Sequence, residues 1–108
     1  MNTHSASDGS APVYSTFADD PDYTDILNVF VEGVPQRIQS LKKMYEGQQI
    51  AELECLAHQL KGAGGGYGFP GVSETATNLE SACQSSDLEA ISARLDELTA
   101  YLSRIAAS

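Results

Sequence analysis

The chain has 108 residues, of which 42% are hydrophobic and 19% are charged, a balance typical of one globular domain. Fifteen Asp and Glu face six Lys and Arg, so the formal net charge is -9. This charge repels nucleic acid and anionic membrane surfaces, and we expect neither as a partner. We find no apolar run that approaches a membrane span and no signal peptide at the start. Cys55 and Cys83 fit no metal-ligand spacing, and we interpret both as buried or half-buried hydrophobic residues in a reducing cytoplasm.

Residues 1–12 are small and polar, and we expect a flexible N-terminal arm there. Residues 13–108 are the expected folded domain, and Val13, Tyr14 and Phe17 offer apolar side chains that can tie the arm to it. A helix should begin at Pro21, because Asp20 can cap it and a proline loses no hydrogen bond at the first helical position.

A long helix is predicted over residues 21–46. Its apolar residues follow one another at spacings of three and four: Leu27, Phe30, Val34, Ile38, Leu41 and Tyr45. Gly33 and Pro35 interrupt this stripe. Because a proline inside a helix costs about 3 kcal/mol or more, we expect either a bend there or a break into two helices. Gly47 is a natural end.

Three more amphipathic helices follow. The second begins near Gln48 and ends at the sequence "GFPG", and the third begins near Pro70 or Gly71. The turn "QSSD" precedes the last helix, whose apolar stripe continues to Ile105; Ser86 and Glu89 have the spacing of a capping box. No segment shows the sustained alternation of a strand. The pattern predicts an all-α fold, an antiparallel up-and-down four-helix bundle with a short N-terminal extension.

The stretch "HQLKGAGGGYGFPG", residues 58–71, holds six of the nine glycines. Its "GYGFPG" matches the letters of a dinucleotide-binding motif, but that motif follows a strand, whereas this stretch follows a predicted helix. A nucleotide-binding P-loop is excluded as well, because no Gly-Lys-Ser/Thr follows the glycines. A metal site lacks ligands, because no second histidine lies near His58 and His4 lies in the arm. Ser73 and Glu54 are too generic to define a hydrolase triad, and we interpret Glu54 as a solvated helix residue. We therefore expect no metal ion and no cofactor on this chain.

The glycines beside His58 lie on two different faces of the second helix. Since a helix turns about 100° per residue, His58 points away from the apolar stripe and shares its face with Lys61, Gly62 and Gly65. A glycine inside a helix costs about 1 kcal/mol relative to alanine. Packing against a neighbouring helix can account for Gly64 but not for Gly62 and Gly65. A bare exposed face beside a nucleophile is what a second protein needs in order to reach the imidazole.

The sequence "AHQLKGAGGGYG", residues 57–68, resembles the signature of histidine-containing phosphotransfer (HPt) domains. That signature is a histidine, any residue, an aliphatic residue, Lys, Gly, small residues, a hydrophobic residue and Gly. Here its positions are occupied by His58, Leu60, Lys61, Gly62, Tyr67 and Gly68. The flanking "FVEGVPQRIQSL" and "TATNLESAC" are similar to the family's flanking helices, so the resemblance covers roughly residues 22–105. The third glycine of "GAGGGY", where alanine or serine is commoner, lowers the expected stability of the helix.

The resemblance implies a phosphorelay carrier without kinase activity. Such a domain accepts a phosphoryl group on His58 from the aspartate of a receiver domain, in a response regulator or hybrid histidine kinase, and passes it to another receiver. The Mg²⁺ belongs to the receiver. Lys61 lies one turn on and is expected to stabilise the phosphoryl group. Gly62, Gly65 and Gln59 are the expected partner-binding residues of a monomer. Two alternatives remain: a phosphoacceptor domain detached from a larger chemotaxis-type histidine kinase, and a non-phosphorylated helical adaptor.

Overall fold

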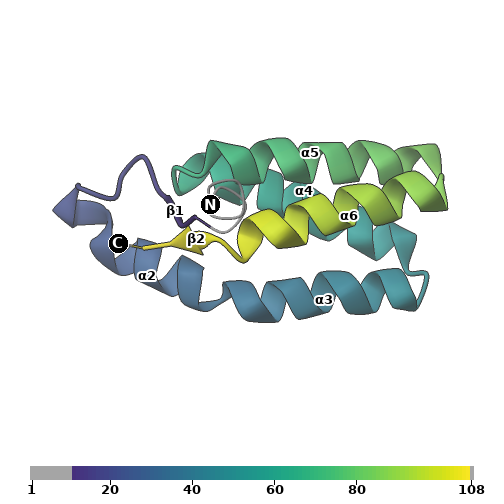
Figure 1. Cartoon of the computed structure of the whole chain (residues 1–108), viewed down its shortest axis with the longest axis horizontal. Helices are drawn as coiled ribbons and strands as arrows, with labels where there is room; N and C mark the ends of the chain where they lie inside the picture. The colour runs from purple at the N-terminus through teal and green to yellow at the C-terminus, as the bar shows by residue number, and fades with distance from the viewer. Residues whose placement is uncertain (1–10, 108) are drawn as a thin grey trace, which may run out of the picture.

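The computed structural model describes residues 11–107, which form a mostly helical bundle (Figure 1). Its four main helices are α3 (Val34–Glu46), α4 (Ile50–Gly66), α5 (Pro70–Ser85) and α6 (Leu88–Leu102). The all-α prediction is therefore confirmed. Of the predicted arm over residues 1–12, all but the last two residues lie outside the described part, and the division into arm and domain stays a prediction.

Short turns join these four helices. The α3–α4 and α5–α6 turns lie at one end of the bundle and the α4–α5 turn at the other (Figure 1). Helix α4 packs mainly against α5, and α5 against α6, while α3 contacts both α4 and α6. The face of α4 that does not meet its neighbours is therefore left to solvent.

The predicted first helix is broken in two at Gly33. Helix α2 (Thr24–Glu32) ends there, and α3 has Pro35 in its first turn, where a missing N–H breaks no helical hydrogen bond. Asp20 acts as a cap, as predicted, since its side chain accepts a hydrogen bond from the N–H of Asp22. The helix that it caps is the short 3-10 helix η1 (Pro21–Tyr23).

Two predictions near the last helix are wrong. Ser86 does not form a capping box with Glu89: it ends α5 with a left-handed φ of 60°, and Asp87 caps α6 by accepting from the N–H groups of Glu89 and Ala90. Helix α6 also stops at Leu102, so Ile105 does not extend it.

Instead, Ile105 belongs to a small parallel sheet that the sequence did not reveal. Strand β2 (Ile105–Ala106) pairs with strand β1 (Val13–Tyr14), with Val13 opposite Ile105. Strands of two residues are too short to show an alternating pattern. The sheet joins the beginning of the described chain to its end (Figure 1).

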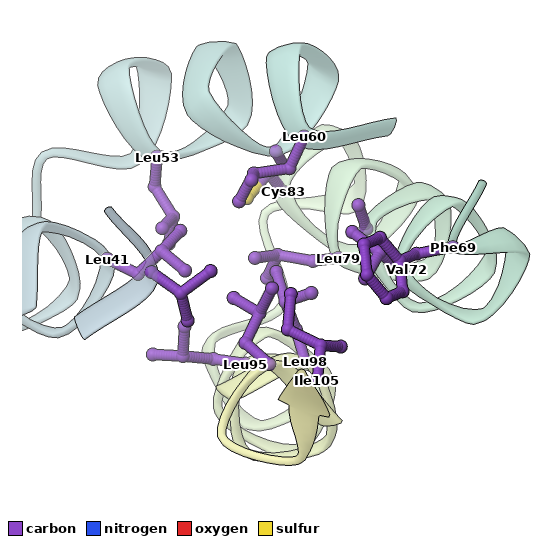
Figure 2. Close-up of a cluster of buried hydrophobic side chains, with 14 of the residues drawn as sticks. Leu41, Leu53, Leu60, Phe69, Val72, Leu79, Cys83, Leu95, Leu98 and Ile105 are labelled. Atoms are coloured by element: carbon purple, nitrogen blue, oxygen red, sulfur yellow. The ribbon is translucent and has the colours of Figure 1, made fainter. Parts of the chain in front are cut away.

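Each of the four main helices contributes at least one fully buried leucine to the core, among them Leu41, Leu53, Leu79 and Leu98 (Figure 2). Burying a side chain of this size stabilises the fold by roughly 1.5–3 kcal/mol. The two cysteines are both free, as predicted. Cys83 lies in this core, where burial raises the pKa of its thiol to about 11. Cys55 is exposed, so the expectation of a buried or half-buried residue is wrong there, because it lies on the outer face of α4.

At Gly64, α4 lies close against the start of α5. A Cβ atom at Gly64 would lie 2.6 Å from the backbone nitrogen of Ser73 and 3.0 Å from the carbonyl oxygen of Phe69. The packing role predicted for this glycine is therefore confirmed. A Cβ atom at Gly62, by contrast, would meet no atom within 4 Å.

We predict opposite effects of alanine at these two positions. Gly64→Ala should destabilise the protein by about 1–3 kcal/mol, because the backbone of α5 must move away. Gly62→Ala should stabilise it by up to about 1 kcal/mol through helix propensity. Urea denaturation followed by circular dichroism measures both values. A Gly64→Ala protein as stable as the wild type would show that α4 and α5 are not closely packed there.

Candidate functional site

His58 lies in the middle of α4 on its outer face. Its side chain is 64% exposed, while Ala57 and Leu60 on either side of it in sequence are buried in the core. The orientation predicted from the helical period is therefore confirmed. The core fixes the rotation of α4, and the rotation of α4 presents the imidazole to solvent.

A carboxylate from the neighbouring helix holds both His58 and Lys61. The Nδ1 atom of His58 lies 2.8 Å from Oε2 of Glu80, and the Nζ atom of Lys61 lies 3.1 Å from Oε1 of the same carboxylate. His58 and Lys61 are one turn apart on α4, whereas Glu80 comes from α5. Only 14% of the Glu80 side chain is exposed, so the carboxylate lies behind the two groups that it binds.

These contacts determine which nitrogen of His58 carries the proton. The hydrogen bond from Lys61, followed by that from His58, lowers the pKa of Glu80 below its ordinary value. Near neutral pH Glu80 is therefore an ionised carboxylate, which can only accept hydrogen bonds. It follows that Nδ1 of His58 is the donor and that, in the neutral imidazole, Nε2 on the other edge of the ring carries the free lone pair.

Two further polar contacts connect α4 to the same flank of α5. The hydroxyl of Ser73 donates to the carbonyl oxygen of Lys61 at 2.6 Å, and Nε2 of Gln84 donates to Oε2 of Glu54 at 3.2 Å. The later residue of α5, Gln84, pairs with the earlier residue of α4, Glu54, as expected for two helices that run in opposite directions. The contacts lie on both sides of Glu80 along α5 and fix its position relative to His58.

Three open glycines continue the exposed face beyond His58. Gly62, Gly65 and Gly66 are all exposed, and an added Cβ atom would meet nothing within 4 Å at Gly62 and Gly66 and only the Ser73 hydroxyl, at 3.8 Å, at Gly65. None of the three has a positive φ. Together they weaken α4 by about 3 kcal/mol relative to alanine. Neither internal packing nor backbone conformation in the described part of the chain requires them.

On the other side of His58 along α4, the surface forms an open groove. It is lined by Ala51, Glu54, Cys55, His58 and Glu80. The predicted partner-binding residue Gln59 is exposed, and its Nε2 lies 3.9 Å from the sulfur of Cys55. Gln59 therefore lies beside the groove and has no hydrogen bond to the imidazole.

Glu80 is the site residue that the sequence prediction missed. Glu54, interpreted from the sequence as a solvated helix residue, accepts a hydrogen bond from Gln84. A signal for Glu80 was present, since Ser73, Glu80 and Gln84 lie within about 40° of one another on the helical wheel. These three polar residues flank the apolar stripe of α5.

Within residues 11–107, no group of three or more His, Cys, Asp or Glu side chains is arranged to hold a metal ion. The helices of this part of the chain also include none with the length and apolar character needed to cross a membrane.

Comparison with known proteins identifies one family. A family model described as "Hpt domain" matches residues 25–108, a range that includes His58, Lys61 and Glu80. No curated protein and no solved structure matches the chain.

We predict that Glu80 selects the tautomer of His58. In the neutral form of the imidazole, ¹⁵N NMR should show a protonated Nδ1 and an unprotonated Nε2. Glu80→Ala should remove this preference, whereas Glu54→Ala should keep it, because Glu54 binds Gln84 rather than His58. Since the pKa of Glu80 is lowered, its interaction is complete at neutral pH and is lost as the pH falls through that lowered pKa. A neutral ring that carries its proton on Nε2 in the native protein would contradict the assignment.

Proposed function

The chain belongs to the Hpt domain family, and on this premise we propose that it carries a phosphoryl group on His58 between the receiver domains of a phosphorelay. Hpt domains take part in histidine phosphotransfer and interact with receiver domains, in general without kinase activity. For this chain we propose a monomeric carrier, not an enzyme, in the cytoplasm. Its donor and acceptor are receivers of response regulators or hybrid histidine kinases.

The observation that supports this role best is the state of the imidazole. His58 is exposed, its Nδ1 is held by Glu80, and its Nε2 carries the lone pair. A neutral imidazole with a free lone pair on Nε2 is a competent nucleophile. Phosphoryl transfer asks mainly for such positioning and for neutralisation of charge.

The proposed step requires no proton transfer. The lone pair of Nε2 attacks phosphorus, the bond from phosphorus to the aspartyl oxygen of the receiver breaks, and aspartate leaves as a carboxylate. The Nδ1 proton stays in place, so the ring of the phosphorylated product carries a positive charge. That charge lies against Glu80, 2.8 Å from Nδ1. Transfer to a second receiver is the reverse of this step.

Lys61 is proposed to neutralise the transferred phosphoryl group. It lies one turn from His58, and its side chain is 39% exposed, so its ammonium can reach a group attached to Nε2. Charge-assisted hydrogen bonds to phosphoryl oxygens are stronger than neutral ones. In the structure the ammonium binds Glu80, and it must leave that carboxylate in order to act.

The open glycines are proposed to admit the receiver. Gly62 and Gly65 leave the surface beside His58 bare, and Gln59 borders it. The receiver supplies its own Mg²⁺, and we propose no metal ion or cofactor on this chain. The antiparallel up-and-down order that we propose for the bundle supports the surface from behind, because α5 lies against α4 along its length.

The first experiment asks whether His58 is the phosphoacceptor. The protein should acquire acid-labile, base-stable phosphate from a phosphorylated receiver, and His58→Gln should abolish labelling with unchanged helical circular dichroism. Labelling that persists in His58→Gln would refute the site, and a wild-type protein that is never labelled by any receiver of its genome would favour a helical adaptor. A histidine kinase domain encoded in the same gene would favour a detached phosphoacceptor domain.

The second experiment asks whether Gly62 admits the partner. Gly62→Gln should fold normally, since no atom lies within 4 Å of the added Cβ atom. It should slow transfer from a receiver at least tenfold, because the side chain obstructs the approach to His58. Phosphoramidate needs no docking and should label the variant at the wild-type rate. Gly47→Gln, at an exposed glycine after α3, is the matched control and should leave both rates unchanged. Unimpaired receiver transfer in folded Gly62→Gln would contradict the docking role.

A further inference from the structure

The glycine-rich end of α4 is weak as a helix and is closed by a specific turn. Glycines weaken the helix interior at positions 62, 64, 65 and 66. The end is formed by Gly68, with a φ of +80°, whose N–H donates to Gly65, and by Phe69, whose N–H donates to Gly64 at 2.7 Å. This is the hydrogen-bond pattern of a Schellman motif. It leaves the carbonyl groups of Tyr67 and Gly68 without partners inside the helix.

Residues 11–17, which we name the strap, supply those partners. The hydroxyl of Ser15 donates to the carbonyl oxygen of Tyr67 at 2.6 Å, and the N–H of Thr16 donates to that of Gly68 at 2.8 Å. Ser15 is only 5% exposed, and its oxygen also accepts from the N–H of Phe17. The strap therefore continues the capping that the helix end itself cannot complete.

Gly68 shows how closely the strap lies on this turn. A Cβ atom there would lie 2.5 Å from the Ser15 hydroxyl oxygen, 2.7 Å from that of Thr16 and 2.8 Å from the ring of Phe17. The positive φ and the strap thus both require glycine. A loosely attached segment would leave room for a methyl group.

The strap is also anchored at two other places. Its β1 strand pairs with β2, where the N–H of Val13 donates to the carbonyl oxygen of Arg104 at 2.8 Å (Figure 1). Nε of Arg104 donates in turn to the carbonyl oxygen of Ala11 at 2.9 Å. At the other end, the ring of Phe17 stacks on that of Tyr23 at 4.3 Å. The strap is therefore attached on both sides of its contact with Tyr67 and Gly68.

From these contacts we propose that the strap keeps the glycine-rich end of α4 helical, so that the cooperative unit that contains His58 begins at the strap. The family match begins only at residue 25, downstream of the strap. Release of the strap would free the carbonyl groups of Tyr67 and Gly68 and let the last turns of α4 fray. This role concerns the stability of the helix and goes beyond the proposed phosphotransfer.

The test compares hydrogen exchange in the full chain with and without the Ser15 hydroxyl. Ser15→Ala leaves the Tyr67 carbonyl unpaired, and backbone amides of residues 62–69 should exchange about tenfold faster, while those of α6 should not change. Ser85→Ala is the matched control. The Ser85 hydroxyl also donates to a carbonyl group and accepts from an N–H two residues on, but at the C-terminal end of α5. It should leave residues 62–69 unchanged.

Unchanged exchange at residues 62–69 in Ser15→Ala, or an equal increase in α6, would overturn the proposal. Gly68→Ala perturbs the same joint from the other side and should give a larger increase in the same segment; Ser15→Ala alone decides the matter if Gly68→Ala does not fold. The readout is independent of phosphorylation. Failure of the protein to accept phosphate would refute the proposed function but would not affect the proposal about the strap.

Discussion

The carboxylate of Glu80 determines the state of the imidazole, and it reaches His58 only because α5 lies close against α4. Gly64 permits this approach, since any side chain there would push against the backbone of Ser73. Ser73 then binds the carbonyl oxygen of Lys61, and Gln84 binds Glu54, which fixes the two helices along their length. The nucleophile therefore lies on one helix, while the group that sets its proton belongs to another.

Glycine serves opposite purposes on the two sides of α4. At Gly64 the missing side chain allows two helices to pack closely, and this packing offsets the low helix propensity of glycine. At Gly62 and Gly66 nothing in the described structure fills the space, so no packing offsets the low helix propensity of glycine. A helix that is weakened on its working face needs support elsewhere. The Schellman turn at Gly68 and the contacts of Ser15 and Thr16 supply it at the end nearest the glycines.

The sequence predicted what depends on periodicity within one element. The helices and the outward direction of His58 follow from the spacing of apolar residues, which tertiary packing did not override. Glu80 was not predictable in this way, because its contact depends on how α5 is rotated and shifted against α4. Ile105 was misassigned because the apolar stripe runs past the end of α6 into a strand two residues long. Ser86 was misread as a cap because Asp87, next to it, is also a good capping residue.

The proposed transfer brings a negatively charged phosphoryl group to a protein whose formal charge is already -9, so in this proposal the local charges beside His58 decide whether the product is tolerated. In the structure, Glu80 binds both the ammonium of Lys61 and Nδ1 of His58. In the proposed transfer the ring becomes positively charged at Nδ1, still in contact with Glu80. The carboxylate therefore keeps a cationic partner when Lys61 turns to the phosphoryl oxygens. Without Glu80 the ammonium would be free from the start, but the positive ring of the product would have no counter-charge. In the proposed transfer, Glu80 binds the Lys61 ammonium before the step and the positive ring after it, so Lys61 can change partners without leaving the carboxylate unpaired.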